Sequence, residues 1–103
     1  MNEYKEQGNA RMSESKFLQA IEAYTKAIEL DQRNHVLFSN RSVAYASNGQ
    51  YTQALQDAIR TIDCAPSWPK GYSRKGDALM LQRMYGEAKR AYEAVRARAR
   101  SDS

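Results

Sequence analysis

The strongest constraint on the fold is an internal repeat of 34 residues. The chain divides without gaps into the units 1–34, 35–68 and 69–102, which we expect to form one domain. Residues of similar size recur at the same place in each unit: aromatic ones at Tyr4, Phe38 and Tyr72 and at Phe17, Tyr51 and Tyr85, and small ones at Gly8, Ser42 and Gly76 and at Ala20, Ala54 and Ala88. A repeat of this length predicts a stack of similar units, each of which buries its apolar face against the next.

Each unit contains two amphipathic helices. Apolar residues recur every three or four positions, as in Phe17, Ala20, Ile21, Tyr24, Ala27 and Ile28, and no stretch alternates as a strand does. The pattern predicts six helices, near residues 2–14, 17–30, 35–48, 51–64, 69–82 and 85–98. Asn34 and Ser67 are the expected N-caps, and Pro69 suits a first helical turn.

Composition excludes several kinds of site. The mean hydropathy is −0.82, and no run approaches the roughly 18 apolar residues of a membrane span, so we expect a cytosolic protein without a membrane partner. A single cysteine and a single histidine cannot form an internal disulfide or a Cys/His metal cluster. We expect Cys64 to be a packed thiol, because it shares the repeat position of Leu30, and His35 to be a surface residue. No triad, paired acids or phosphate loop is evident, so we expect no enzyme, cofactor or small-molecule substrate.

The net charge of +4 is concentrated near the C-terminus, where residues 89–103 hold five basic and two acidic side chains. Cations at the end of a helix are favoured by its dipole. The segment RARAR at 96–100 could also bind a phosphate backbone electrostatically, although aromatic residues do not alternate with its arginines. Nucleic-acid binding through this tail is therefore an alternative function.

Stacked helix hairpins form a superhelix whose concave side is lined by the first helix of each hairpin. Five hydrogen-bond donors fall on those helices: Lys5, Asn9, Asn40, Lys70 and Arg74. Lys5 and Asn9 are one helical turn apart, as are Lys70 and Arg74, while Asn40 shares the repeat position of Arg74. Three cations and two amides in one groove predict a site for a pair of carboxylates.

The repeat pattern resembles the tetratricopeptide repeat, which has large, small and aromatic residues at these positions. The resemblance covers the whole chain and implies an all-α fold, a right-handed superhelical solenoid of three antiparallel helix hairpins. The chain departs from the pattern at a few positions. Gln7 and Arg11 replace a usual leucine and tyrosine, Ala58 replaces an aromatic residue, and Pro66 alone provides the usual proline.

The segments KEQGN (5–9), LFSNRSVAY (37–45) and KGYSRKGDAL (70–79) resemble the two-carboxylate clamp of co-chaperone repeat domains, most of all the first repeat domain of the chaperone-organising type. This resemblance implies binding of a Glu-Glu-Val-Asp tail of a cytosolic heat-shock chaperone, with heat-shock protein 70 favoured over heat-shock protein 90. It places Lys5, Asn9 and Asn40 around the terminal carboxylate, and Lys70 and Arg74 on the Asp side chain. The alternative is a groove for another acidic peptide.

Other positions allow further predictions. Met12 and Met80 could contact an apolar peptide residue or serve only in helix packing. In the last helix, charged residues replace the apolar ones of earlier units, so we expect it partly to cap itself and to leave Tyr92 and Val95 incompletely covered, which favours self-association. Met1 suggests a native N-terminus, and any additional solvating helix is expected to be absent or to lie beyond residue 103.

Overall fold

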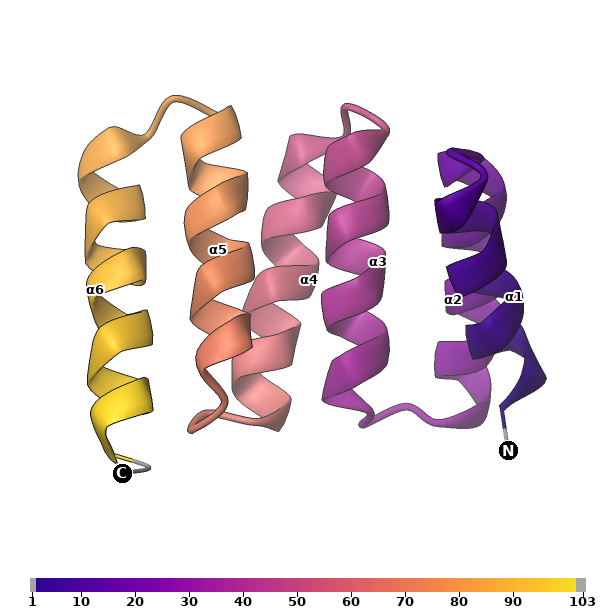
Figure 1. The fold of residues 1–103 in the computed structure, drawn as a ribbon, viewed down its shortest axis with the longest axis horizontal. Coiled ribbons are helices and arrows are strands. Elements are labelled where there is room, and N and C mark those ends of the chain that lie inside the picture. Colours follow the sequence, from indigo (N-terminus) through magenta and orange to yellow (C-terminus); the bar gives the residue numbers. More distant parts are fainter. Residues whose placement is uncertain (1, 102–103) are drawn as a thin grey trace.

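The computed structural model describes residues 2–101, which form six α-helices in antiparallel pairs (Figure 1). The helices are α1 (Glu3–Ser13), α2 (Phe17–Leu30), α3 (His35–Ser47), α4 (Tyr51–Cys64), α5 (Pro69–Leu81) and α6 (Tyr85–Ser101). The described part of the chain contains no strand, so the all-α prediction is confirmed. The predicted repeats 1–34 and 69–102 include residues 1 and 102, which lie outside the described residues.

Local chemistry explains where the helices begin and end. Asn34 caps α3 as predicted, because its Oδ1 accepts a hydrogen bond from the Val36 amide at 3.0 Å. The prediction of Ser67 as N-cap is wrong: Trp68 occupies that position, since Pro69 begins α5 and keeps the residue before it extended. Helix α6 continues past residue 98 because alanine and arginine favour helix and no Gly or Pro intervenes before Ser101.

Close contact between the two helices of a hairpin explains the small residue at the eighth position of each repeat. A Cβ on Gly8 would lie 2.5 Å from the ring of Tyr24, and a Cβ on Gly76 would lie 2.5 Å from the ring of Tyr92. Any larger residue would clash with these rings, so glycine is needed for the two helices to approach this closely. In the middle hairpin the equivalent Ser42 is buried and donates a hydrogen bond to the Ala54 carbonyl at 2.8 Å.

A buried ion pair joins the two helices of the second hairpin and also contacts the first hairpin. Arg41 on α3 donates to both carboxylate oxygens of Asp57 on α4, at 2.7 and 2.9 Å, and to the Thr25 hydroxyl on α2 at 3.1 Å. Burial alone would lower the pKa of Arg41, but the hydrogen bonds and charge of Asp57 outweigh burial and raise it. Helices α2, α3 and α4 are thereby joined through polar contacts that the sequence analysis did not foresee.

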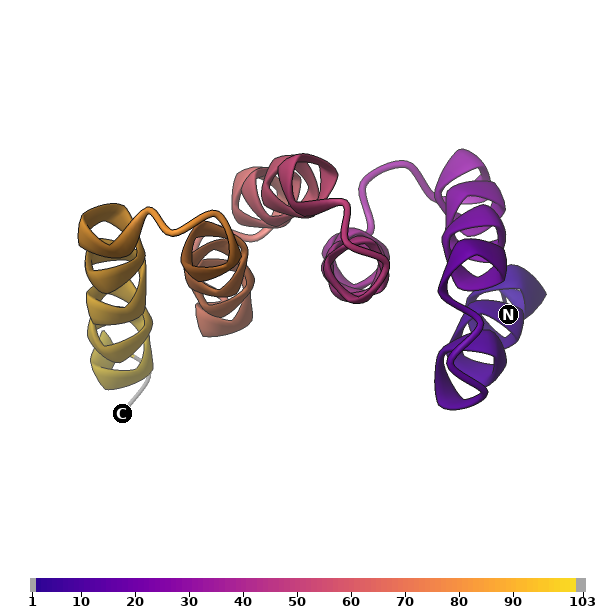
Figure 2. The same cartoon turned by 90° about the horizontal axis from the view of Figure 1, so that it is seen from above.

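The hairpins stack side by side in a bent row. Viewed from above, α3 and α5 lie on one side of the row and α4 lies on the other (Figure 2). Helix α3 contacts α5 directly, while α2 and α4 pack against the first helix of the next hairpin. The face that carries α3 and α5 is called the inner face below, and the face that carries α4 is called the outer face.

Candidate functional site

The five residues predicted to form the site lie on the first helix of each hairpin. Lys5 and Asn9 are on α1, Asn40 is on α3, and Lys70 and Arg74 are on α5. Asn9 and Lys70 are exposed, and the other three are half-buried. All five side chains therefore keep access to solvent.

Asn9 and Asn40 are in contact. The Tyr24 hydroxyl donates a hydrogen bond to Asn9 Oδ1, and Asn40 Nδ2 donates to the same oxygen at 3.5 Å. Burial raises the pKa of Tyr24, which keeps its hydroxyl protonated and able to donate. Because Oδ1 of Asn9 is held in this way, the amide nitrogen of Asn9 is left as a donor for an incoming anion.

Arg74 connects α5 to α3. Its Nε donates to the buried Ser39 hydroxyl at 3.2 Å, next to Asn40 in the sequence. On the other side, Arg74 Nη1 lies 4.0 Å from Oδ2 of Asp77, and Asp77 accepts a hydrogen bond from the Tyr92 hydroxyl at 2.7 Å. The guanidinium is thus positioned from two helices.

Lys5 and Lys70 lie at the beginnings of their helices. Lys70 Nζ is 5.8 Å from the centre of the Trp68 ring, a cation–π arrangement. Lys5 lines a shallow hollow together with Leu30, Asp31 and Asn34. Between residues 2 and 101, neither lysine forms a hydrogen bond to the other three predicted residues. The structure therefore brings Asn9 into contact with Asn40 and Arg74 into contact with α3, but in the described part of the chain both lysines stay outside this hydrogen-bonded group.

A small hollow of about 130 Å³ lies beside Arg74. Its lining comes from α3 and α5: Ser42, Val43, Ala46, Ser47, Arg74, Asp77 and Ala78. In the first hairpin Tyr24 packs against Ala44 of the next helix, whereas the equivalent residues one repeat later are Ala58 and Ala78. The absence of a ring at Ala58 accounts for the space against Ala78.

Sequence reasoning missed Ser39 and Asp77 as neighbours of Arg74. Asp77 could have been found, because it occupies the same repeat position as Asn9. Asp77 is the carboxylate beside Arg74 and competes with any anionic ligand for that guanidinium. The same register makes Tyr92 the counterpart of Tyr24, and both hydroxyls donate to a side chain at that position.

The two methionines differ in environment. Met12 is half-buried and packs on a cluster of Ala20, Ile21, Tyr24 and Ala44, which accords with a packing role. Met80 is exposed and shares a surface hollow with Tyr85 and Tyr92 of α6. As predicted, Tyr92 and Val95 are only partly covered.

One expectation about a single residue is wrong, and the structure does not support the reason given for another. His35 is not a plain surface residue, because it is half-buried and its ring packs edge-on to Trp68 with centroids 4.8 Å apart. Leu30, which shares the repeat position of Cys64, is 69% exposed and therefore gives no support to the packed thiol expected at Cys64. Cys64 itself is half-buried.

The described residues hold no group of three His, Cys, Asp or Glu side chains that could bind a metal ion. No helix within 2–101 is both long enough and apolar enough to cross a membrane. In the basic tail, Arg98 is half-buried and donates hydrogen bonds to the Tyr72 hydroxyl and the Pro66 carbonyl. That arginine is therefore engaged within the molecule.

Three antiparallel hairpins with a polar inner face define a helical-repeat protein. Family models described as tetratricopeptide repeats match residues 4–34 and 23–56. The chain belongs to the tetratricopeptide repeat family.

Relatives and solved structures agree with this assignment. The "Heat shock protein sti1 homolog" of Schizosaccharomyces pombe is 47% identical over 91 residues, which are 88% of this chain and 15% of that relative. The first repeat domain of Spaghetti (RPAP3), solved with the HSP90 peptide SRMEEVD, has a TM-score of 0.88 at 35% identity and covers 92% of this chain and 75% of that one. The second repeat domain of human RPAP3, solved with the HSP70 peptide SGPTIEEVD, has a TM-score of 0.87 at 34% identity and covers 92% and 79%.

Proposed function

We propose that this chain is the protein-interaction module of a co-chaperone and binds the acidic C-terminal tail of a heat-shock chaperone in the inner-face groove. The observation that carries the proposal is the contact of donors from different hairpins: Asn9 with Asn40, and Arg74 with Ser39. These contacts gather polar groups suited to carboxylates from three helices. The likeness to repeat domains solved with EEVD peptides supports the same ligand class.

In this proposal Lys5, Asn9 and Asn40 bind the terminal carboxylate, while Lys70 and Arg74 bind the side chain of the last aspartate. The hollow of about 130 Å³ beside Arg74 accepts a small apolar side chain of the peptide. Binding needs no cofactor and no chemical step. We take the three units 1–34, 35–68 and 69–102 as a single domain that acts in the cytoplasm.

We further propose that the tail of heat-shock protein 70 is preferred over that of heat-shock protein 90. The support is the likeness of the three clamp segments to the first repeat domain of chaperone-organising co-chaperones, together with 47% identity to a sti1 homolog. Titration of this chain with SGPTIEEVD and with SRMEEVD measures the preference directly. Tighter binding of SRMEEVD would overturn this part of the proposal.

Amidation of the peptide C-terminus tests the clamp itself. We expect free SGPTIEEVD to bind with a dissociation constant of about 1 μM, or about −8 kcal/mol. The amidated peptide keeps its size but loses the terminal charge, so most of this affinity should disappear. Equal binding of the two peptides in calorimetry would exclude a carboxylate clamp and leave a groove for some other acidic feature.

The alternative of nucleic-acid binding through the tail has less support. Of the three tail arginines, Arg98 already donates to Tyr72 and Pro66, so fewer guanidinium groups are available for phosphates. A steep salt dependence of oligonucleotide binding would favour this alternative.

A further inference from the structure

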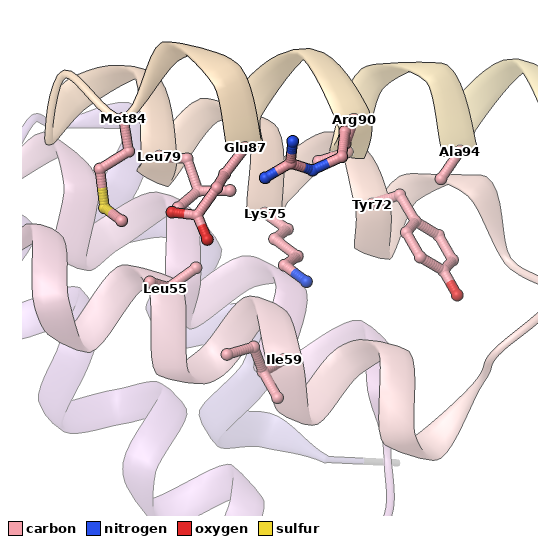
Figure 3. A pocket seen from close by; sticks show the side chains of 10 residues that line it. Leu55, Ile59, Tyr72, Lys75, Leu79, Met84, Glu87, Arg90 and Ala94 are labelled. Carbon is pink, nitrogen blue, oxygen red and sulfur yellow. The ribbon is translucent and has the colours of Figure 1, made fainter.

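The outer face carries a hollow of about 380 Å³ between α4, α5 and α6 (Figure 3). Leu55, Leu79 and Ala91 form its apolar part, and the charged side chains of Lys75, Glu87 and Arg90 also line it. The five proposed clamp residues are not among its lining residues. The hollow is therefore separate from the five proposed clamp residues.

The ammonium group of Lys75 is the feature of this hollow that favours an acidic ligand. Its side chain extends from α5 into the space between α4 and α6, and the carboxylate of Glu87 lies on the α6 side of the same space (Figure 3). Lys75 is half-buried, and it forms no ion pair or hydrogen bond with any residue from 2 to 101. A partly desolvated ammonium group without an anionic partner favours an incoming carboxylate.

The preceding hairpin shows how a carboxylate fits at this place. Lys75 occupies the repeat position of Arg41, and Ala91 occupies that of Asp57. In the second hairpin, the Asp57 carboxylate of α4 is buried against Arg41 of α3. In the third hairpin, Ala91 removes the acid at this position, and the other acid of the hollow, Glu87, is exposed and forms no ion pair with Lys75 among the described residues.

The residues at the opening of the hollow indicate what kind of ligand would provide a carboxylate to Lys75. Ile59 and Met84 are 41% and 42% exposed, so two large apolar side chains lie at the opening beside the charged ones. Exposed apolar residues grouped around a cleft are typical of surfaces that bind protein partners. Pockets for small molecules instead enclose most of the ligand, whereas this hollow is open to solvent.

We propose that this hollow binds a segment of a partner protein in which an acidic residue is flanked by apolar residues. The acidic side chain pairs with Lys75, and the apolar neighbours lie on Leu55, Ile59 and Met84. Arg74, which faces α3, and Lys75, which faces this hollow, are consecutive residues of α5. The inner and outer faces can thus be occupied at the same time.

A blocked peptide tests the proposal without engaging the clamp. The probe is acetyl-Ala-Leu-Glu-Leu-Ala-amide, which has no free terminal carboxylate, titrated into the ¹⁵N-labelled chain. We expect saturable shifts of the amides of Leu79 and Ala91. The same peptide with glutamine in place of glutamate should bind about two- to fivefold more weakly, as for a partly exposed ion pair.

Matched variants locate the effect. Lys75→Gln should remove the difference between the two peptides, while Lys89→Gln, an exposed lysine of α6 outside the hollow, should preserve it. Ala91→Asp supplies an internal carboxylate for Lys75 and should weaken binding of the glutamate peptide. The proposal is overturned by equal binding of both peptides, by equal losses in the two lysine variants, or by the absence of shifts in the hollow. Loss of free SGPTIEEVD binding by the unaltered chain would overturn the clamp alone.

Discussion

Arg98 lies over the ring of Tyr72, with its guanidinium carbon 4.6 Å from the ring centroid and Nη2 2.8 Å from the hydroxyl oxygen. Its Nε also donates to the Pro66 carbonyl at 3.3 Å. A residue of the basic tail thus fastens the end of α6 to the beginning of α5. This contact explains how the last helix remains packed although charged residues replace the apolar ones of earlier repeats.

Arg98→Ala should therefore destabilise the chain by about 1 kcal/mol, because it removes two partly exposed hydrogen bonds and a cation–π contact. Hydrogen exchange should show the loss mainly in the last turns of α6. Arg96→Ala, at an exposed position of the same helix, is the control. Equal exchange rates in the two variants would contradict a fastening role for Arg98.

Asp57→Ala should lower the free energy of unfolding much more than Arg98→Ala does. It would leave the half-buried Arg41 without its partner, and breaking a buried ion pair costs about 3–5 kcal/mol. Urea unfolding measures this loss. Asp63→Ala removes an exposed acid from the same helix and should change the free energy of unfolding by less than about 0.5 kcal/mol. Similar losses in both variants would mean that the buried pair contributes no special stability.

Arg74→Ala should weaken binding of SGPTIEEVD by about 1.5–3 kcal/mol, or about 10- to 150-fold, because a carboxylate would lose its donor in a groove partly desolvated by the peptide. Arg96→Ala should change the affinity by less than about twofold, since Arg96 is an exposed residue of α6 outside the proposed clamp and exposed charges are screened by salt. Fluorescence anisotropy with a labelled peptide compares the two. If both changes weaken binding equally, a diffuse electrostatic surface replaces the clamp.

High pH should destabilise the third hairpin through Tyr92. Burial, together with the hydrogen bond and charge of Asp77, raises the pKa of Tyr92 to about 12. Between about pH 10 and 12 the folded chain keeps a proton that the unfolded chain releases, so the free energy of unfolding falls as pH rises. Tyr92→Phe should show a smaller fall between about pH 10 and 12 in urea unfolding. An identical fall in both proteins would show that Tyr92 does not titrate in this way.

The repeat register made much of the fold predictable. Five of the six helices lie within one residue of their predicted bounds, because the apolar stretches recur at a regular spacing. Asn, Gly or Pro marks three of the five connections, at 31–34, 48–50 and 65–68, whereas the other two turn at Ser15 and Arg83 with positive φ angles of 60° and 62°. The sixth runs on to Ser101 because its sequence provides no stop signal. The register also assigned Lys5, Asn9, Asn40, Lys70 and Arg74 to the first helix of each hairpin.

Contacts between side chains on different helices were harder to predict. The approach of Asp77 to Arg74 and the packing of Arg98 on Tyr72 depend on rotamers that no repeat pattern specifies. Asp57 did leave a signal, since it falls on the buried face of α4 between Ala54 and Thr61. An acid on an otherwise buried face predicts a buried cation, and Arg41 is that cation.

Two neighbouring cations of α5 have opposite surroundings, with Arg74 against α3 and Lys75 in the outer hollow. Anions bound at both places would be separated by little more than one helix and would repel each other. Thermodynamic linkage then requires that each ligand lower the affinity for the other by the same factor. Added salt should reduce that factor, so the chain would discriminate most strongly between singly and doubly occupied states at low ionic strength.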